Sequence, residues 1–142
     1  MLAQDLELGR CLIARLDHGI DIVSQMADLA KNEMIGTGIF SAIGALMQAD
    51  LAYYDQVSHE YHKIPIDKPV ELVSCNGNIS IRDGQPFVHA HASLADSEGH
   101  VWGGHLIGGK VFAAELCIQE LLGKPMVRKY DPITGLNLWG NQ

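Results

Sequence analysis

Two turn signals divide residues 71–109 into three segments in which polar and apolar residues alternate. Asp83-Gly84 is a pair typical of two-residue β-hairpin turns. Asp96-Ser97-Glu98-Gly99 is a second turn signal, in which Gly99 can adopt a left-handed backbone conformation. The pattern therefore predicts three antiparallel strands that follow one another as a meander.

The same segment carries three histidines, and their relative positions depend on the second turn. His89 and His91 are two residues apart, so a strand directs both side chains to one face. If the turn is the three-residue loop Ser97-Glu98-Gly99 with a glycine bulge, His105 lies directly opposite His91 on that face. A loop of even length would move His105 to the other face, unless Gly103-Gly104 forms a bulge.

The first hairpin adds two asparagines to the histidine face. With a two-residue turn at Asp83-Gly84, Asn78 pairs with His89 and Asn76 pairs with His91. A polar side chain beside a metal-bound imidazole can fix the orientation of the ring without itself binding the metal. Asn76 and Asn78 are therefore predicted to orient the imidazoles.

Three converging imidazoles are a metal-site pattern. Neutral imidazole is a good ligand for zinc, copper, nickel and iron. Three protein ligands with an open fourth position are typical of catalytic rather than structural zinc. We therefore predict a divalent metal ion, zinc before the others, at His89, His91 and His105. The alternative is that the three imidazoles are polar groups on a half-buried strand face, hydrogen-bonded to their neighbours.

By its length, the 142-residue chain is predicted to form one domain, residues 1–142. Asp21 is a typical N-cap residue, and the apolar stripe that follows it predicts an amphipathic helix over 22–32, packed on the sheet. Further strands are expected over 6–16, 39–43, 46–54 and 59–64, with turns at Gly36, Gly38 and Gly44.

Residues 111–122 fit two kinds of secondary structure. Their alanine, glutamate and leucine content favours a helix. Their alternation equally fits a buried strand. That strand would have Phe112, Ala114, Leu116 and Ile118 on one face.

Charge and cysteine content limit the classes of partner. The formal net charge is −7, with 17 acidic and 10 basic residues, and DNA binding requires a basic face. Direct contact with nucleic acid is therefore not expected. The sequence shows neither a membrane-helix segment nor the basic-then-apolar pattern of a signal peptide. Cys11, Cys75 and Cys117 are widely spaced in apolar runs, which predicts reduced core residues in a cytoplasmic protein.

The order of these motifs resembles the PPC (plants and prokaryotes conserved) domain over about residues 9–136. The most specific parts are Gly77-Asn78-Ile79-Ser80, His89-Ala90-His91 and Gly103-Gly104-His105-Leu106. The resemblance implies an α/β (α+β) fold with a mixed, largely antiparallel sheet, a strand over 111–120 and a homotrimer. It also implies a fold similar to acetolactate decarboxylase and to a zinc-dependent ester hydrolase. In those proteins three histidines in a similar order hold zinc. The matching positions in this sequence are His89, His91 and His105.

Two main classes of function follow. One is a metal-dependent lyase or hydrolase acting on a small molecule, with Glu71 considered as general base, Glu115 as fourth metal ligand and Arg128 as carboxylate clamp. The register predicts that Glu71 lies on the face opposite the histidines. The other class is a DNA-binding, regulatory or scaffold protein without catalysis. Plant PPC proteins carry an AT-hook, a basic minor-groove reader, and this sequence resembles the stand-alone prokaryotic type without it.

A third possibility is a structural trimer that is stabilised by the metal. In such a trimer the fourth position would be closed by a carboxylate or by another subunit. The expected interface residues are Leu46, Leu51, Tyr53 and Trp102.

Overall fold

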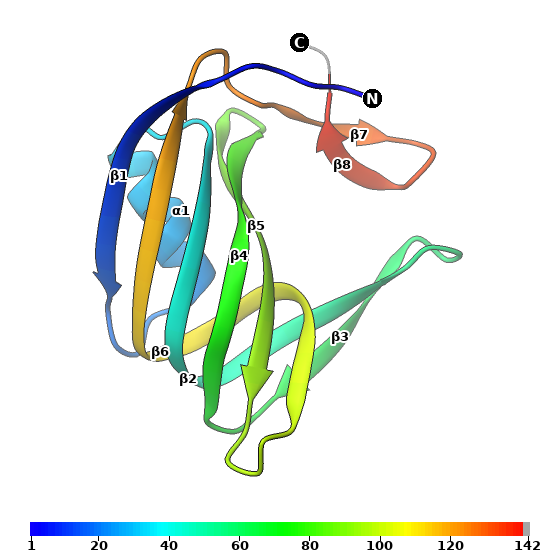
Figure 1. The fold of residues 1–142 in the computed structure, drawn as a ribbon. Helices are drawn as coiled ribbons and strands as arrows, with labels where there is room; N and C mark the ends of the chain where they lie inside the picture. Colours follow the sequence, from blue (N-terminus) through cyan, green and yellow to red (C-terminus); the bar gives the residue numbers. More distant parts are fainter. Residues whose placement is uncertain (141–142) are drawn as a thin grey trace.

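The computed structural model describes residues 1–140, which form one helix and eight strands (Figure 1). Six of the strands form one sheet, the last two form a separate hairpin, and all of these strand pairings are antiparallel. The predicted fold class is confirmed. In chain order the elements are β1 (Glu7–Leu16), α1 (Ile22–Asn32), β2 (Gly38–Asp55), β3 (Glu60–Ile66), β4 (Val70–Arg82), β5 (Gln85–Ala95), β6 (Val101–Leu122), β7 (Arg128–Asp131) and β8 (Leu136–Trp139).

The long strand β6 gives the sheet its shape. The strand order is β1-β6-β5-β4-β2-β3, and β6 also pairs with β2. Residues 101–105 of β6 pair with β5, residues 105–120 pair with β2, and residues 114–122 also pair with β1 on the other side. The sheet therefore curves back on itself, as the path of β6 across the lower part of Figure 1 shows.

The helix α1 packs on β5 and β6 and closes the core, as predicted. Its buried side chains, Ile22, Met26 and Ala30, recur every four residues and form one stripe. The predicted N-cap is confirmed, because the Asp21 carboxylate accepts a hydrogen bond from the Ser24 backbone N–H at 2.8 Å. The other Asp21 oxygen accepts from the Gly109 N–H at 2.8 Å, which fastens the start of the helix to β6.

Two bulges change the arrangement expected for β2 and β6. Residues 39–54 were expected as two strands joined by a turn at Gly44, but β2 is continuous and its register with β4 shifts there. Gly44 has φ of 145°, and a Cβ would lie 2.2 Å from the Ala113 carbonyl oxygen, so a side chain is excluded. In β6, Leu46 faces Val111 and Ala45 faces Ala113, which leaves Phe112 as an extra residue at the surface. Residues 111–122 are a strand, but Phe112 does not share the buried face of Ala114.

The face of the sheet away from α1 is open and partly apolar. Its exposed apolar residues come from four strands: Ile13, Ile39, Ile43, Val73 and Phe112. We call these five residues the open apolar face. Leu46 and Leu51, which were expected at an interface, are instead 1% and 0% exposed and belong to the core. Cys11 is also exposed rather than buried, and its Sγ lies 3.7 Å from that of Cys117.

Within residues 1–140, no helix is long and apolar enough to cross a membrane.

Candidate metal centre

The two hairpins have the registers predicted from their turns. Asn78 faces His89 and Asn76 faces His91 across β4 and β5, and His91 faces His105 across β5 and β6. The second turn has three residues between Asp96 and His100, and Gly99 within it has φ of 83°. All three histidines therefore lie on the face of the sheet that points away from α1.

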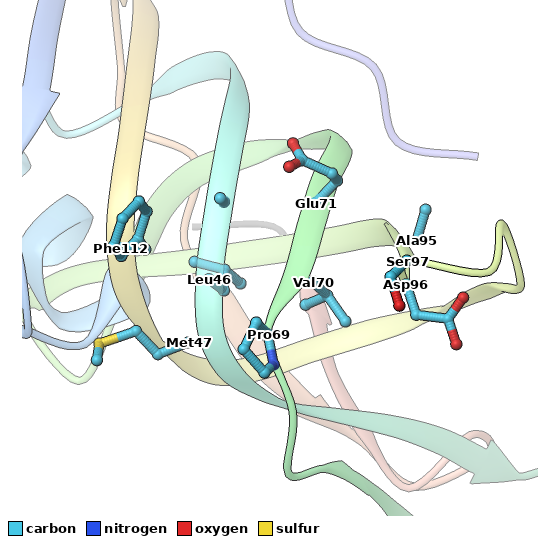
Figure 2. Close-up of a pocket in the computed structure, with 10 residues that line it drawn as sticks. Leu46, Met47, Pro69, Val70, Glu71, Ala95, Asp96, Ser97 and Phe112 are labelled. Atoms are coloured by element: carbon cyan, nitrogen blue, oxygen red, sulfur yellow. The ribbon is translucent and has the colours of Figure 1, made fainter.

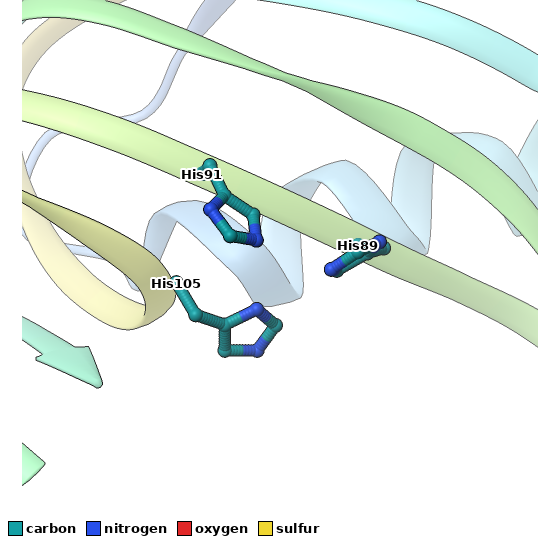
Figure 3. A group of neighbouring side chains, drawn as sticks. All are labelled: His89, His91 and His105. Atoms are coloured by element: carbon teal, nitrogen blue, oxygen red, sulfur yellow. The ribbon is translucent and has the colours of Figure 1, made fainter. Parts of the chain in front are cut away.

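The three imidazoles converge on one point (Figure 3). The ring centroids of His89 and His91 are 5.2 Å apart, those of His89 and His105 are 5.2 Å apart, and those of His91 and His105 are 5.5 Å apart. One nitrogen from each ring lies within 4.8 Å of the other two. Small rotations of the rings bring three nitrogen atoms this close within the usual bonding distance of a single ion, roughly 2.1 Å.

The protonation state of the site suits a metal. Burial lowers the pKa of His89 to about 4, and the nearby charges of Arg128, His105 and His91 act in the same direction. Burial also lowers the pKa of His105. Both rings are therefore neutral at neutral pH, as metal ligation requires. The Nδ1 atom of His105 is buried and has no hydrogen-bond partner among residues 1–140, an orphan that a metal bond would satisfy. The residues present fit a metal ion.

Arg128 on β7 reaches the face that carries the three histidines, as its predicted role of carboxylate clamp requires. Its Nη2 donates to Asn78 Oδ1 at 2.9 Å, and its Nε donates to Ser80 Oγ at 2.8 Å. The guanidinium also lies over the Phe87 ring, 5.2 Å from its centroid. In this structure the side-chain oxygen of Asn78 accepts a hydrogen bond from Arg128 and not from an imidazole. No hydrogen bond joins Asn76 or Asn78 to an imidazole in the described part of the chain, so their orienting role stays a prediction.

Tyr61 on β3 is a member of the site that sequence reasoning missed. Its ring centroid lies 5.3 Å from that of His105 and 4.8 Å from that of Tyr54. Residues 59–64 were expected to form a strand, but nothing in their sequence showed which side chain would face the histidines. That depends on the β2–β3 register, which places Tyr61 opposite Tyr54.

The two carboxylates considered for catalysis lie elsewhere. A register shift between Leu72 and Ser74 places Glu71 opposite Ala95, so alternation puts it on the histidine face, contrary to the prediction. Its partner Ala95 is four residues along β5 from His91. Glu71 itself lines a pocket of about 590 Å³ (Figure 2). Glu115 faces Ile43, ten positions along β6 from His105. Within one chain it therefore cannot be the fourth ligand.

Residues 4–122 match the Plants and Prokaryotes Conserved (PCC) domain, also abbreviated PPC. The chain belongs to this family. This PPC chain is similar to a metal-containing protein of Archaeoglobus fulgidus, with 39% identity, a TM-score of 0.96, and coverage of 99% of this chain and 100% of that one. It is also similar to a plant- and prokaryote-conserved protein of Pyrococcus horikoshii, with 40% identity, a TM-score of 0.94, and coverage of 100% and 99%.

More distant relatives of the PPC chain carry other descriptions. It is 32% identical over 124 residues to a bifunctional protein GlmU of Synechococcus, a match covering 85% of this chain and 19% of the relative. The chain thus spans about a fifth of the length of the curated relatives it matches. A candidate DNA-binding protein of Ralstonia eutropha has 27% identity, a TM-score of 0.81, and coverage of 92% and 90%.

The predicted likeness to acetolactate decarboxylase is confirmed at the level of the fold alone. A Staphylococcus aureus protein of unknown function, described as similar to α-acetolactate decarboxylase, has 12% identity and a TM-score of 0.52. The match covers 80% of this chain and 53% of that one.

Proposed function

We propose that this PPC protein binds one divalent metal ion, with zinc as the best match, and acts on a small molecule as a lyase or hydrolase. The observation that carries the proposal is the convergence of three imidazole rings, with one nitrogen from each within 4.8 Å of the other two. The metal-containing relative, 39% identical to this chain, supports it. Bound zinc polarises a carbonyl group or lowers the pKa of bound water to about 7.

The residues around the imidazoles suggest how a substrate is held. No carboxylate belongs to the histidine group within residues 1–140, so three protein ligands leave coordination positions for substrate or water. Arg128 supplies a fixed positive charge beside His89, and Tyr61 supplies an aromatic wall beside His105. Tyr61 also carries a hydroxyl group that can donate or accept a hydrogen bond.

The DNA-binding or scaffold alternative has one observation in its favour, the candidate DNA-binding relative. Against it stands the net charge of −7, which is repelled by phosphate. We therefore rank it second. The ranking of these two functions would be reversed if the purified protein bound duplex DNA at physiological salt and a variant without the three histidines bound it equally well.

We also infer that the protein is a homotrimer in a reducing, cytoplasmic setting. The open apolar face would be covered by neighbouring copies, since single chains seldom leave apolar side chains of several strands together at the surface. The pocket beside it, lined by Met47, Glu71 and Phe112, would receive side chains of the neighbouring copy. The free thiols of Cys11, Cys75 and Cys117 are consistent with reducing conditions.

The deciding experiment is elemental analysis of protein purified without a histidine tag. We expect about one metal ion per chain, because the three imidazoles form one ligand set. The double variant His89→Ala/His91→Ala should lose the metal and keep its fold, since both side chains lie outside the core.

The matched control is His62→Ala/His100→Ala. These two histidine side chains are 58% and 66% exposed and lie outside the triad, so the control should retain the metal. Absence of metal from the native protein, after supply of zinc during growth, would overturn the proposal. Equal metal loss in both variants would also overturn it.

A further inference from the structure

Arg128 is held in place without a negatively charged partner. Its three hydrogen bonds go to Asn78 Oδ1, Ser80 Oγ and the Asn137 carbonyl oxygen, at 2.9, 2.8 and 3.0 Å. No carboxylate forms an ion pair with it in the part of the chain that the structure describes. A half-buried guanidinium without a counter-charge is unusual in a chain with 17 acidic residues.

The position of this cation is set by rigid elements. Asn78 faces His89 and Ser80 faces Phe87 in the β4–β5 pairing, and the guanidinium bonds to both polar side chains. The rings of Phe87 and Trp139 lie beside it, with centroids 5.2 and 5.8 Å from Cζ. The cation is therefore fixed over the histidine face, next to the first of the three imidazoles.

Arg128 keeps two N–H groups for a further acceptor. A guanidinium has five N–H groups, of which the three hydrogen bonds use one on Nε, one on Nη1 and one on Nη2. One N–H remains on each terminal nitrogen. Two parallel N–H groups match two oxygens of a carboxylate or phosphate.

The charges of the site favour the same ligand. Three neutral imidazoles leave a bound divalent cation with its full charge of about +2, and Arg128 adds another positive charge. The histidine group contains no acidic side chain among the described residues. A concentrated positive charge of this kind in a half-buried place favours an anionic ligand.

We propose that Arg128 and the metal centre form one site for a small substrate that carries an oxyanion group, a carboxylate or a phosphate. This rests on the proposed function and specifies its substrate class. Arg128 binds the oxyanion through its two free N–H groups, and Asn78 and Ser80 position the guanidinium. A second oxygen of the substrate lies toward the three imidazoles.

The test is calorimetric titration of the metal-loaded protein with malonate, whose two carboxylates could reach both parts of the site. Dimethyl malonate tests the need for charge, and inorganic phosphate tests the other oxyanion. Two variants remove the receptor: Arg128→Gln removes the cation, and Asn78→Asp places a carboxylate beside the guanidinium with little change in shape. Arg82→Gln is the matched control, because Arg82 also lies over Phe87 but pairs with Asp83.

We expect malonate or phosphate to bind the native protein and the uncharged ester not to bind. Affinity should fall by roughly tenfold or more in Arg128→Gln and in Asn78→Asp, and by less than about twofold in Arg82→Gln. The better of the two anions identifies the group. Equal affinity in native protein and both receptor variants, or tighter binding of the ester, would overturn the inference.

Metal content measured on the same samples separates the two proposals. A protein that holds metal but binds anions independently of Arg128 refutes the oxyanion site and leaves the metal centre intact. A protein without metal refutes the proposed function. Anion binding to that metal-free protein, abolished in Asn78→Asp, would still support Arg128 as the receptor.

Discussion

At the scale of single residues, Gly77 keeps β4 close to the histidine strand. A Cβ at this position would lie 2.0 Å from the His89 carbonyl oxygen and 2.6 Å from Cζ of Phe40. Neither a backbone carbonyl in a paired strand nor a core ring can move away easily. The absence of a side chain at Gly77 is therefore a condition for placing His89 beside its neighbours.

We predict that Gly77→Ala destabilises the protein by about 1–3 kcal/mol or more and weakens metal binding, because β5 must shift at His89. Denaturant unfolding and metal titration measure the two effects. Gly103→Ala is the control, since the nearest atom to its added Cβ lies 3.6 Å away, an ordinary contact. Native stability and metal affinity in Gly77→Ala would contradict this account.

The sequence was informative about the histidines and less so about their neighbours. His89, His91 and His105 could be brought together because two short turns determine the register of three consecutive strands. Tyr61 and Arg128 come from β3 and β7, whose positions depend on tertiary packing rather than on a turn. Their arrival beside the imidazoles could not be read from local spacing.

At the scale of elements, the β5–β6 loop is held by one carboxylate. The Asp96 side chain, 3% exposed, accepts from the backbone N–H groups of Glu98 and His100 at 2.9 and 3.0 Å and from Lys68 Nζ at 2.7 Å. The Lys68 ammonium, followed by these N–H groups, holds the pKa of Asp96 far below its usual range. This loop sets the register that places His105 opposite His91.

Stability should therefore depend on Asp96 at neutral pH and lose that dependence in acid. The folded-state pKa is below the unfolded value of about 3.9, so the stabilisation is present above about pH 4 and is lost as the pH falls below it. We predict that Asp96→Asn lowers the melting temperature at neutral pH and that its difference from native protein narrows below about pH 4. Thermal unfolding across this range measures the difference.

The control for this prediction is Asp83→Asn in the other hairpin turn. The Asp83 side chain is 95% exposed, so its replacement should leave the melting temperature close to the native value at each pH. A difference between native protein and Asp96→Asn that stays constant from neutral to acidic pH would show that the charge of Asp96 does not stabilise the loop.

Elements were predicted best where one local signal sufficed. The helix α1 follows from its N-cap and its apolar stripe, and it has the predicted bounds. The bulge at Gly44 was missed because a glycine between two strand-like segments also fits a turn. The bulge at Phe112 was missed because one extra residue is not visible in the alternation of a single strand. Only the register with the partner strand shows whether a bulge is present.

At the scale of the whole molecule, the open apolar face gives a prediction about assembly. If copies pack through this face, a charge at Ile43 must be buried at the interface and should split the trimer. We expect Ile43→Asp to reduce the mass in light scattering from three chains to one chain of 15.5 kDa. The native fold should persist, because Ile43 is 55% exposed in the single chain.

The matched control adds the same charge away from that face. Val57 lies in the β2–β3 turn and is 94% exposed, so Val57→Asp should keep the native mass. A single-chain mass for the native protein at the same concentration would refute the trimer. Three-chain mass in Ile43→Asp would place the interface on another surface.

The pairing of β1 with β6 has a consequence for the newly synthesised protein. Glu7 pairs with Leu122 and Leu16 with Ala114, so β1 leaves the ribosome long before its partner does. During synthesis of the roughly one hundred residues between them, at about 5–20 residues per second, β1 is an unpaired strand for several seconds or more. Such a strand can pair with other chains. Arg10 and Arg15 on this strand add positive charges during the interval, a recognised protection against such pairing.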